Sequence, residues 1–143
     1  MFIGEYKHNL DNKGRLAVPA KFRALLKKGA VVTKGLDNCL FLYSKEEWDK
    51  NAKKFSNLPI SQSKVRAFAR HTLAGAMYVN FDNQGRINSP DYLIKFANLK
   101  KKTIIAGLYD RLEIWDENIW EKYKKETDKE TEKIAETLGE LGI

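Results

Sequence analysis

The sequence predicts an α+β protein, mainly β with helices, in which one structural unit occurs twice and the copies pair about a pseudo-twofold axis. Two observations predict this fold. Residues 11–19, DNKGRLAVP, recur as residues 82–90, DNQGRINSP, with five of nine positions identical. Apolar residues that follow each copy also correspond, as Trp48 does to Trp120. Such a repeat defines the structural unit before any single element is considered.

The shared motif Asp-x-x-Gly-Arg predicts a tight turn between two antiparallel strands. Asp11 can accept hydrogen bonds from the backbone of the turn, and Gly14 suits a left-handed residue at its end. Arg15 then opens the outgoing strand on the face opposite Leu16, because side chains alternate along a strand. The residues predicted to shape the two turns are Asp11, Gly14, Asp82 and Gly85.

Each element of the first copy has its own signal. Alternating polar and apolar residues predict a strand that ends near Leu10, where the turn begins. After the strand at 15–18, Pro19 suits the first turn of a short helix, and Gly29 ends that helix. Two apolar runs predict the remaining strands of this copy, at 30–33 and 40–43.

Helices are predicted between the copies and after the second one. Ser44 and Glu47 form a capping box that starts a helix, Pro59 ends it, and Ser61 starts another. Asp116 caps a final helix whose later part is almost wholly polar, so we expect it to project or to pack on another subunit. We predict one domain over 1–143, with repeats at about 5–48 and 76–120, a helical linker at 45–74 and a C-terminal helix at about 117–140.

The second copy repeats the order of the first. Its strands are predicted at 77–81, 86–89, 103–106 and 112–115, with a helix after Pro90 and one inserted residue near 100–102. Four short strands and one helix cannot close a core alone. Two copies about a twofold axis can close a small barrel without open edges, and this places both Arg turns in equivalent positions.

Composition and charge indicate the class of partner and the cellular compartment of the protein. The net charge is +7, and residues 1–72 carry 15 Lys+Arg against 6 Asp+Glu, which favours a polyanionic partner. We find no apolar run long enough to span a membrane and no signal-peptide pattern, and we expect a cytoplasmic protein. Cys39, the single cysteine, lies in an apolar run and is interpreted as buried.

The sequence does not predict an enzyme. His8 and His71 have no neighbouring nucleophile or carboxylate pair, and we find no phosphate-binding loop or metal-spaced cluster. We therefore expect no catalytic residue, metal, cofactor or small-molecule substrate. The duplicated arginines instead suit phosphate or the guanine edge, and glutamine can read adenine. The candidate DNA-binding residues are Arg15, Arg86, Lys13 and Gln84 on the turns, with Lys7, Lys21 and Arg23 as possible phosphate contacts.

Several segments resemble the MraZ family of bacterial transcriptional regulators, which is related to AbrB and SpoVT. They are MFIG at 1–4, NLDNKGRLAVP at 9–19, CLFLY at 39–43, DNQGR at 82–86 and LEIWD at 112–116. The resemblance implies an AbrB-like barrel of swapped-hairpin or double-psi topology, formed within one chain, and a homo-oligomeric ring of such chains. It also implies binding of double-stranded DNA at direct repeats upstream of a division and cell-wall gene cluster, hence association with the nucleoid.

In that family the Asp-x-x-x-Arg motif contacts DNA, which maps onto Asp11 with Arg15 and onto Asp82 with Arg86. The second copy departs from the family pattern at residues 88–90 and at Ile94, so the expected phosphate contacts are assigned to the first copy. Two other interpretations stay open. One is an AbrB-like antitoxin or transition-state regulator, and the other is a protein-interaction assembly module that grips an acidic partner.

Overall fold

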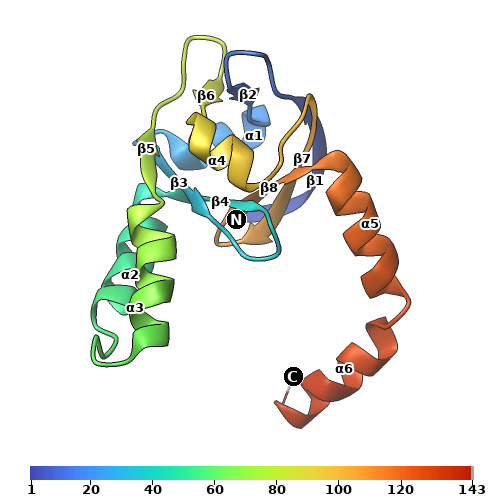
Figure 1. Cartoon of the computed structure of the whole chain (residues 1–143). Helices are drawn as coiled ribbons and strands as arrows, with labels where there is room; N and C mark the ends of the chain where they lie inside the picture. The colour runs from blue at the N-terminus through green and yellow to red at the C-terminus, as the bar shows by residue number, and fades with distance from the viewer. Residues whose placement is uncertain (143) are drawn as a thin grey trace.

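The computed structural model describes residues 1–142 and confirms the α+β prediction (Figure 1). The strands are β1 (Phe2–Asn9), β2 (Arg15–Ala17), β3 (Ala30–Lys34), β4 (Leu40–Ser44), β5 (Met77–Val79), β6 (Arg86–Asn88), β7 (Lys102–Tyr109) and β8 (Leu112–Asp116). The helices are α1 (Ala20–Arg23), α2 (Lys45–Ser56), α3 (Ser63–Ala69), α4 (Asp91–Phe96), α5 (Glu117–Asp128) and α6 (Thr131–Glu140). A 3-10 turn at Ala24–Leu26 follows α1, and a π-helical turn at Arg70–Ala74 follows α3.

The strand order is symmetric under exchange of the two halves. The larger sheet has the order β1-β7-β8-β4-β3-β5, and β2 pairs with β6 in a separate ribbon. Strands β1–β4 correspond to β5–β8, so exchanging the halves turns this order into its own reverse. The first strand of each half pairs with the third strand of the other. Neither half can therefore complete its sheet without its twin.

The register places the pseudo-twofold axis within two strand pairs. At the centre of the β2–β6 ribbon, Leu16 faces Ile87, which holds the same position in the second copy. At the centre of the β4–β8 pair, Phe41 faces its own counterpart, Glu113. β1 and β5 remain the outer strands of the larger sheet. One isolated bridge, between Leu10 and Leu16, joins the end of β1 to the ribbon, and packing of the ribbon across the larger sheet encloses the core.

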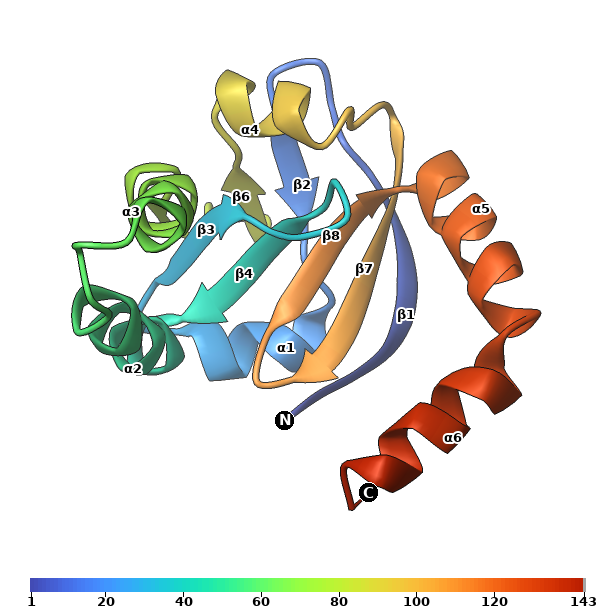
Figure 2. The same ribbon diagram turned by 60° about the horizontal axis from the view of Figure 1, so that its bottom comes forward.

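The core lies between the larger sheet and the layer formed by the ribbon, α1 and α4. Its largest fully buried side chains come from both halves and include Leu16, Leu40, Ile87, Leu93 and Leu112. Two smaller clusters lie outside this core. Trp48 of α2 packs on Val31 and Tyr43, while Trp115 packs with Trp120 of α5. Figure 2 shows α2 and α5 on opposite flanks of the sheet.

Side-chain caps start both long helices where the sequence predicts them. The Ser44 hydroxyl accepts a hydrogen bond from the Glu47 N–H at 3.2 Å, and Asp116 accepts from the first turn of α5. The expected single helix over 117–140 is instead two helices. The Glu130 N–H donates to the Thr127 carbonyl, three residues back, which ends α5 in a tight turn. Beyond that turn no residue up to 142 is buried against the body, so packing does not hold the helix straight.

We predict that truncating either residue at the centre of the ribbon destabilises the whole fold. Leu16→Ala and Ile87→Ala should each lower the free energy of unfolding by about 2–5 kcal/mol, because each leaves a cavity in a fully buried core. Urea unfolding followed by circular dichroism measures this. Leu36→Ala, at a leucine that is 54% exposed, is the control and should cost about 0.5 kcal/mol or less. Equal stability of all three variants would contradict the shared core.

Candidate nucleic-acid interface

The first lip, residues 11–15, is a tight turn that its own aspartate holds closed. Asp11 Oδ1 accepts hydrogen bonds from the backbone N–H of Lys13 at 2.9 Å and of Arg15 at 2.8 Å. Asp11 Oδ2 accepts from the Arg15 Nε–H at 2.6 Å. Gly14 has a φ of +79°, which glycine adopts without the steric cost that a side chain brings. One carboxylate thus fixes both the turn and the direction of the arginine.

The second lip, residues 82–86, repeats this geometry. Asp82 Oδ1 accepts from the backbone N–H of Gln84 and of Arg86, each at 2.9 Å. Asp82 Oδ2 accepts from the Arg86 Nε–H, also at 2.9 Å. Gly85 has a φ of +75°. The duplicated motif therefore forms a duplicated structure.

The ribbon brings the two lips side by side (Figure 1). The Ser89 N–H donates to the Gly14 carbonyl at 2.8 Å, and the Val18 N–H donates to the Gly85 carbonyl at 3.3 Å. Each lip is thus hydrogen-bonded to the outgoing chain of the other half. Arg86 Nη1 also lies 3.8 Å from Asp11 Oδ2, which links the lips through their side chains.

Both guanidinium groups lie at the surface rather than inside the fold. The side chains of Arg15 and Arg86 are 34% and 25% exposed. Each guanidinium donates its Nε–H to the aspartate of its own lip. Within residues 1–142 the Nη groups of Arg15 have no hydrogen-bond partner. Lys13 and Gln84 are exposed beside them at the tips of the lips. The structure thus gathers four of the predicted residues on one surface.

The three other predicted contacts, Lys7, Lys21 and Arg23, lie elsewhere. Lys21 Nζ lies over the Tyr6 ring, 4.4 Å from its centroid. Lys7 Nζ lies 3.3 Å from Glu117 Oε1 at the start of α5, so this lysine faces that helix. Arg23 lies behind the second lip, where its Nε–H donates to the Val18 carbonyl at 3.0 Å and its guanidinium contacts Gly85. Arg23 therefore supports a lip from behind. A phosphate contact by Lys7, Lys21 or Arg23 stays a prediction.

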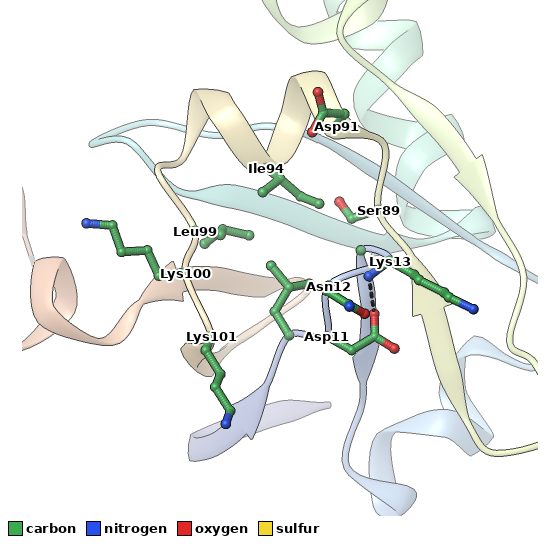
Figure 3. Close-up of a pocket in the computed structure, with 11 residues that line it drawn as sticks. Asp11, Asn12, Lys13, Ser89, Asp91, Ile94, Leu99, Lys100 and Lys101 are labelled. Atoms are coloured by element: carbon green, nitrogen blue, oxygen red, sulfur yellow. Dashed lines mark hydrogen bonds between the residues drawn. The ribbon is translucent and has the colours of Figure 1, made fainter.

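A groove of about 650 Å³ lies behind the first lip, and sequence reasoning did not predict it (Figure 3). It is lined by the lip itself, by the start of α4 and by the loop from α4 to β7. Its lining residues include Lys13, Ser89, Asp91, Ile94, Lys100 and Lys101. One feature of the sequence is related to the groove: the residue inserted in the second copy, near 100–102, falls in the loop that lines it.

Other reactive side chains are accounted for by packing. Cys39 is fully buried, and burial raises the pKa of its thiol far above the ordinary value. A ring nitrogen of His71 lies 3.0 Å from the Gly35 carbonyl, and burial lowers the pKa of His8. No group of three or more potential metal ligands occurs within residues 1–142. Among the helices of the same residues, none combines the length and apolar character needed to cross a membrane.

The hydrogen bonds within each lip lower the pKa of its aspartate, Asp11 or Asp82. The backbone N–H of Arg15 is the main cause that lowers the pKa of Asp11 below its ordinary value of 3.8, and the Arg15 side chain adds to it. Arg86 has the same effects on the pKa of Asp82. Since both pKa values are depressed in the folded protein, the carboxylates stabilise the lips above the ordinary pKa. That contribution is lost as the pH falls through the folded value.

We predict that the side chains of Asp11 and Asp82 titrate with midpoints below 3.8 in the folded protein. Carboxyl carbon chemical shifts followed by NMR across the acid range measure both midpoints. In Arg15→Ala, the midpoint of Asp11 should rise while that of Asp82 stays in place, because each guanidinium hydrogen-bonds its own aspartate. A midpoint of Asp11 that does not move in this variant would remove the guanidinium as a cause.

Comparisons with known proteins agree with the duplicated structure. The family model described as "MraZ protein, putative antitoxin-like" matches twice, at residues 1–71 and 72–140. Proteins called "Transcriptional regulator MraZ" from Thermoanaerobacter pseudethanolicus, Acetivibrio thermocellus and Halothermothrix orenii are 48%, 47% and 46% identical to this chain. Each alignment covers all of this chain and all of the relative. The chain therefore belongs to the MraZ family.

Proposed function

We propose that the chain is a non-enzymatic transcriptional regulator that binds double-stranded DNA with its two lips. Its targets are short direct repeats upstream of its own division and cell-wall gene cluster. One observation carries the proposal: two arginines lie side by side at the surface, each held through Nε by an aspartate. The names of the relatives support it, since those proteins are called transcriptional regulators.

The geometry of each lip suits contact with DNA. A guanidinium held through Nε keeps its Nη groups for a bidentate contact with a phosphate or with O6 and N7 of guanine. Because Asp11 and Asp82 already orient the side chains, less rotamer entropy is lost when DNA binds. Lys13 and Gln84 lie where they can contact a phosphate and an adenine edge next to the arginines.

Charge and assembly support the same function. The excess of basic residues in 1–72 provides long-range attraction to a polyanion. Two lips make only a few base contacts, so a single protomer binds weakly. A homo-oligomeric ring whose protomers bind successive repeats multiplies these weak contacts, provided that the spacing of the repeats matches that of the protomers. Such a protein acts in the cytoplasm, on the nucleoid.

We predict that Arg15→Ala and Arg86→Ala each abolish the preference for the upstream repeats over scrambled DNA. A bidentate contact is worth about 1–3 kcal/mol, and every protomer of the assembly loses it. Fluorescence anisotropy with both duplexes measures the preference, and thermal unfolding shows that the variants still fold.

Arg70→Ala is the matched control, because Arg70 is an exposed arginine of the π-helical turn and its loss changes the net charge equally. This variant should keep the preference. Binding of the repeats by Arg15→Ala or Arg86→Ala as tightly as by the unmodified chain would refute the assignment. Failure of the unmodified chain to bind any duplex would favour the module that grips an acidic protein.

We also predict a steep dependence of DNA affinity on salt. Each neutralised phosphate releases counterions, so the logarithm of the association constant should fall linearly with that of the salt concentration. The expected slope is about −0.9 per phosphate contact. Binding isotherms from low to physiological salt give this slope. An affinity that does not change across the series would rule out a phosphate-contacting interface.

A further inference from the structure

The two lips share their aspartate, glycine and arginine, with Lys13 and Gln84 at the corresponding tip positions, and they also differ in the residues behind them. The helix of each half places one side chain against the glycine of the opposite lip. α1 provides Arg23, whose guanidinium fills the space behind Gly85. α4 provides Ile94 at the corresponding position, and its Cδ1 is the closest side-chain atom behind Gly14. Because isoleucine is shorter, the space behind the first lip stays open as the groove (Figure 3).

Two further differences between the copies occur at this groove. The chain from Ala97 to Lys102 is one residue longer than its counterpart from Leu26 to Ala30, and Lys100 and Lys101 lie in this longer loop. Ser89 stands where the first copy has Val18. The main chain of the groove is fixed, since the Lys101 carbonyl accepts from the Leu10 N–H at 2.8 Å and the Lys100 N–H donates to Asp116 at 3.3 Å.

Ser89 supplies an unused donor at the wall of the groove. The residue is 3% exposed, and its hydroxyl is the one buried side-chain oxygen or nitrogen within residues 1–142 that has no hydrogen-bond partner. Its backbone N–H is already held by the Gly14 carbonyl. A buried hydroxyl without a partner is unfavourable, so a ligand that accepts its hydrogen bond gains affinity from it.

The charges at the groove favour an anion. Lys13, Lys100 and Lys101 are exposed at its rim, and none of them forms an ion pair within residues 1–142. The two nearby carboxylates are engaged, Asp11 by Arg15 and Asp91 by Lys95, whose Nζ lies 2.9 Å away. Figure 3 shows these three lysine side chains extending outward from the rim, so their charge attracts an anion to the groove, where Ser89 offers a hydroxyl donor.

We propose that the groove behind the first lip binds a phosphate group, and that the filled space behind the second lip does not. This inference rests on the proposed function, in which the phosphate belongs to the DNA backbone next to the base contacts of Arg15. The pseudo-twofold lips alone present the same arginines in both orientations. A phosphate contact on one side only fixes the orientation of each protomer, which direct repeats require.

The first test is the salt dependence of DNA binding by Lys100→Gln/Lys101→Gln. The slope should decrease in magnitude by about 1, because one phosphate contact is lost. Ser89→Val, which copies the Val18 side chain of the other half, should weaken binding about tenfold without a change of charge. The matched control is Lys27→Gln/Lys28→Gln in the corresponding loop of the first half, and its slope should equal that of the unmodified chain.

The second test needs no DNA. Inorganic phosphate is titrated into the full-length isotopically labelled protein at constant ionic strength, with the amide signals of Ser89, Lys100 and Lys101 observed by NMR. Saturable shifts of these signals, lost in Lys100→Gln/Lys101→Gln, support the groove as a phosphate site. If they occur while the DNA slope is unchanged, the phosphate comes from a free phosphorylated ligand rather than from DNA.

The outcomes separate this inference from the proposed function. If Arg15→Ala loses repeat-specific binding while the groove variants match the unmodified chain and phosphate shifts no signal, the groove assignment is wrong and the function stands. An equal change of slope in the Lys27→Gln/Lys28→Gln control also overturns the assignment. If the unmodified chain binds no DNA, the phosphate titration alone decides whether the groove is a phosphate site.

Discussion

Pairing of β2 with β6 is the constraint on which the rest of the structure depends. This short ribbon carries Leu16 and Ile87 into the centre of the core, and it is the continuation of both lips. Burial of the apolar face thus fixes the position of the polar turns, because a shift of register by one residue would turn the apolar side chains outward. The two arginines lie side by side for the same reason that the protein folds.

Within each lip, one aspartate carboxylate accepts hydrogen bonds both from the backbone of the turn and from the arginine side chain. Oδ1 of the aspartate orders the turn through two backbone N–H groups, while Oδ2 orients the guanidinium. Exposed ion pairs usually add little stability. Here each ion pair orients the arginine side chain, and it determines which N–H groups of the guanidinium remain available for a ligand. Turn and binding group are thus one unit, which explains why the whole motif occurs twice rather than the arginine alone.

The sequence predicted the repeated unit, the turns and the capped helices, because these depend on local patterns such as Ser44 with Glu47. It also placed Arg15 and Arg86 at exposed turns. It did not predict the separation of α5 from α6, which reflects missing tertiary contacts rather than a local signal. The groove was missed for a similar reason. From the sequence alone, Arg23 is interpreted as a basic residue at the surface. Its position behind the lip of the other half becomes evident only in the folded structure.

Duplication within one chain allows a binding surface that two identical chains cannot form. A dimer of identical subunits has the same side chain behind both lips, so it stays symmetric and suits a symmetric target. Here the copies share the interactions that shape the lips but differ at Arg23 and Ile94, and at Val18 and Ser89. The differences lie behind the lips, where they alter neither the ribbon nor the aspartates. The fold thus keeps the same arginine geometry in both lips, while the residues behind the lips make the binding surface asymmetric.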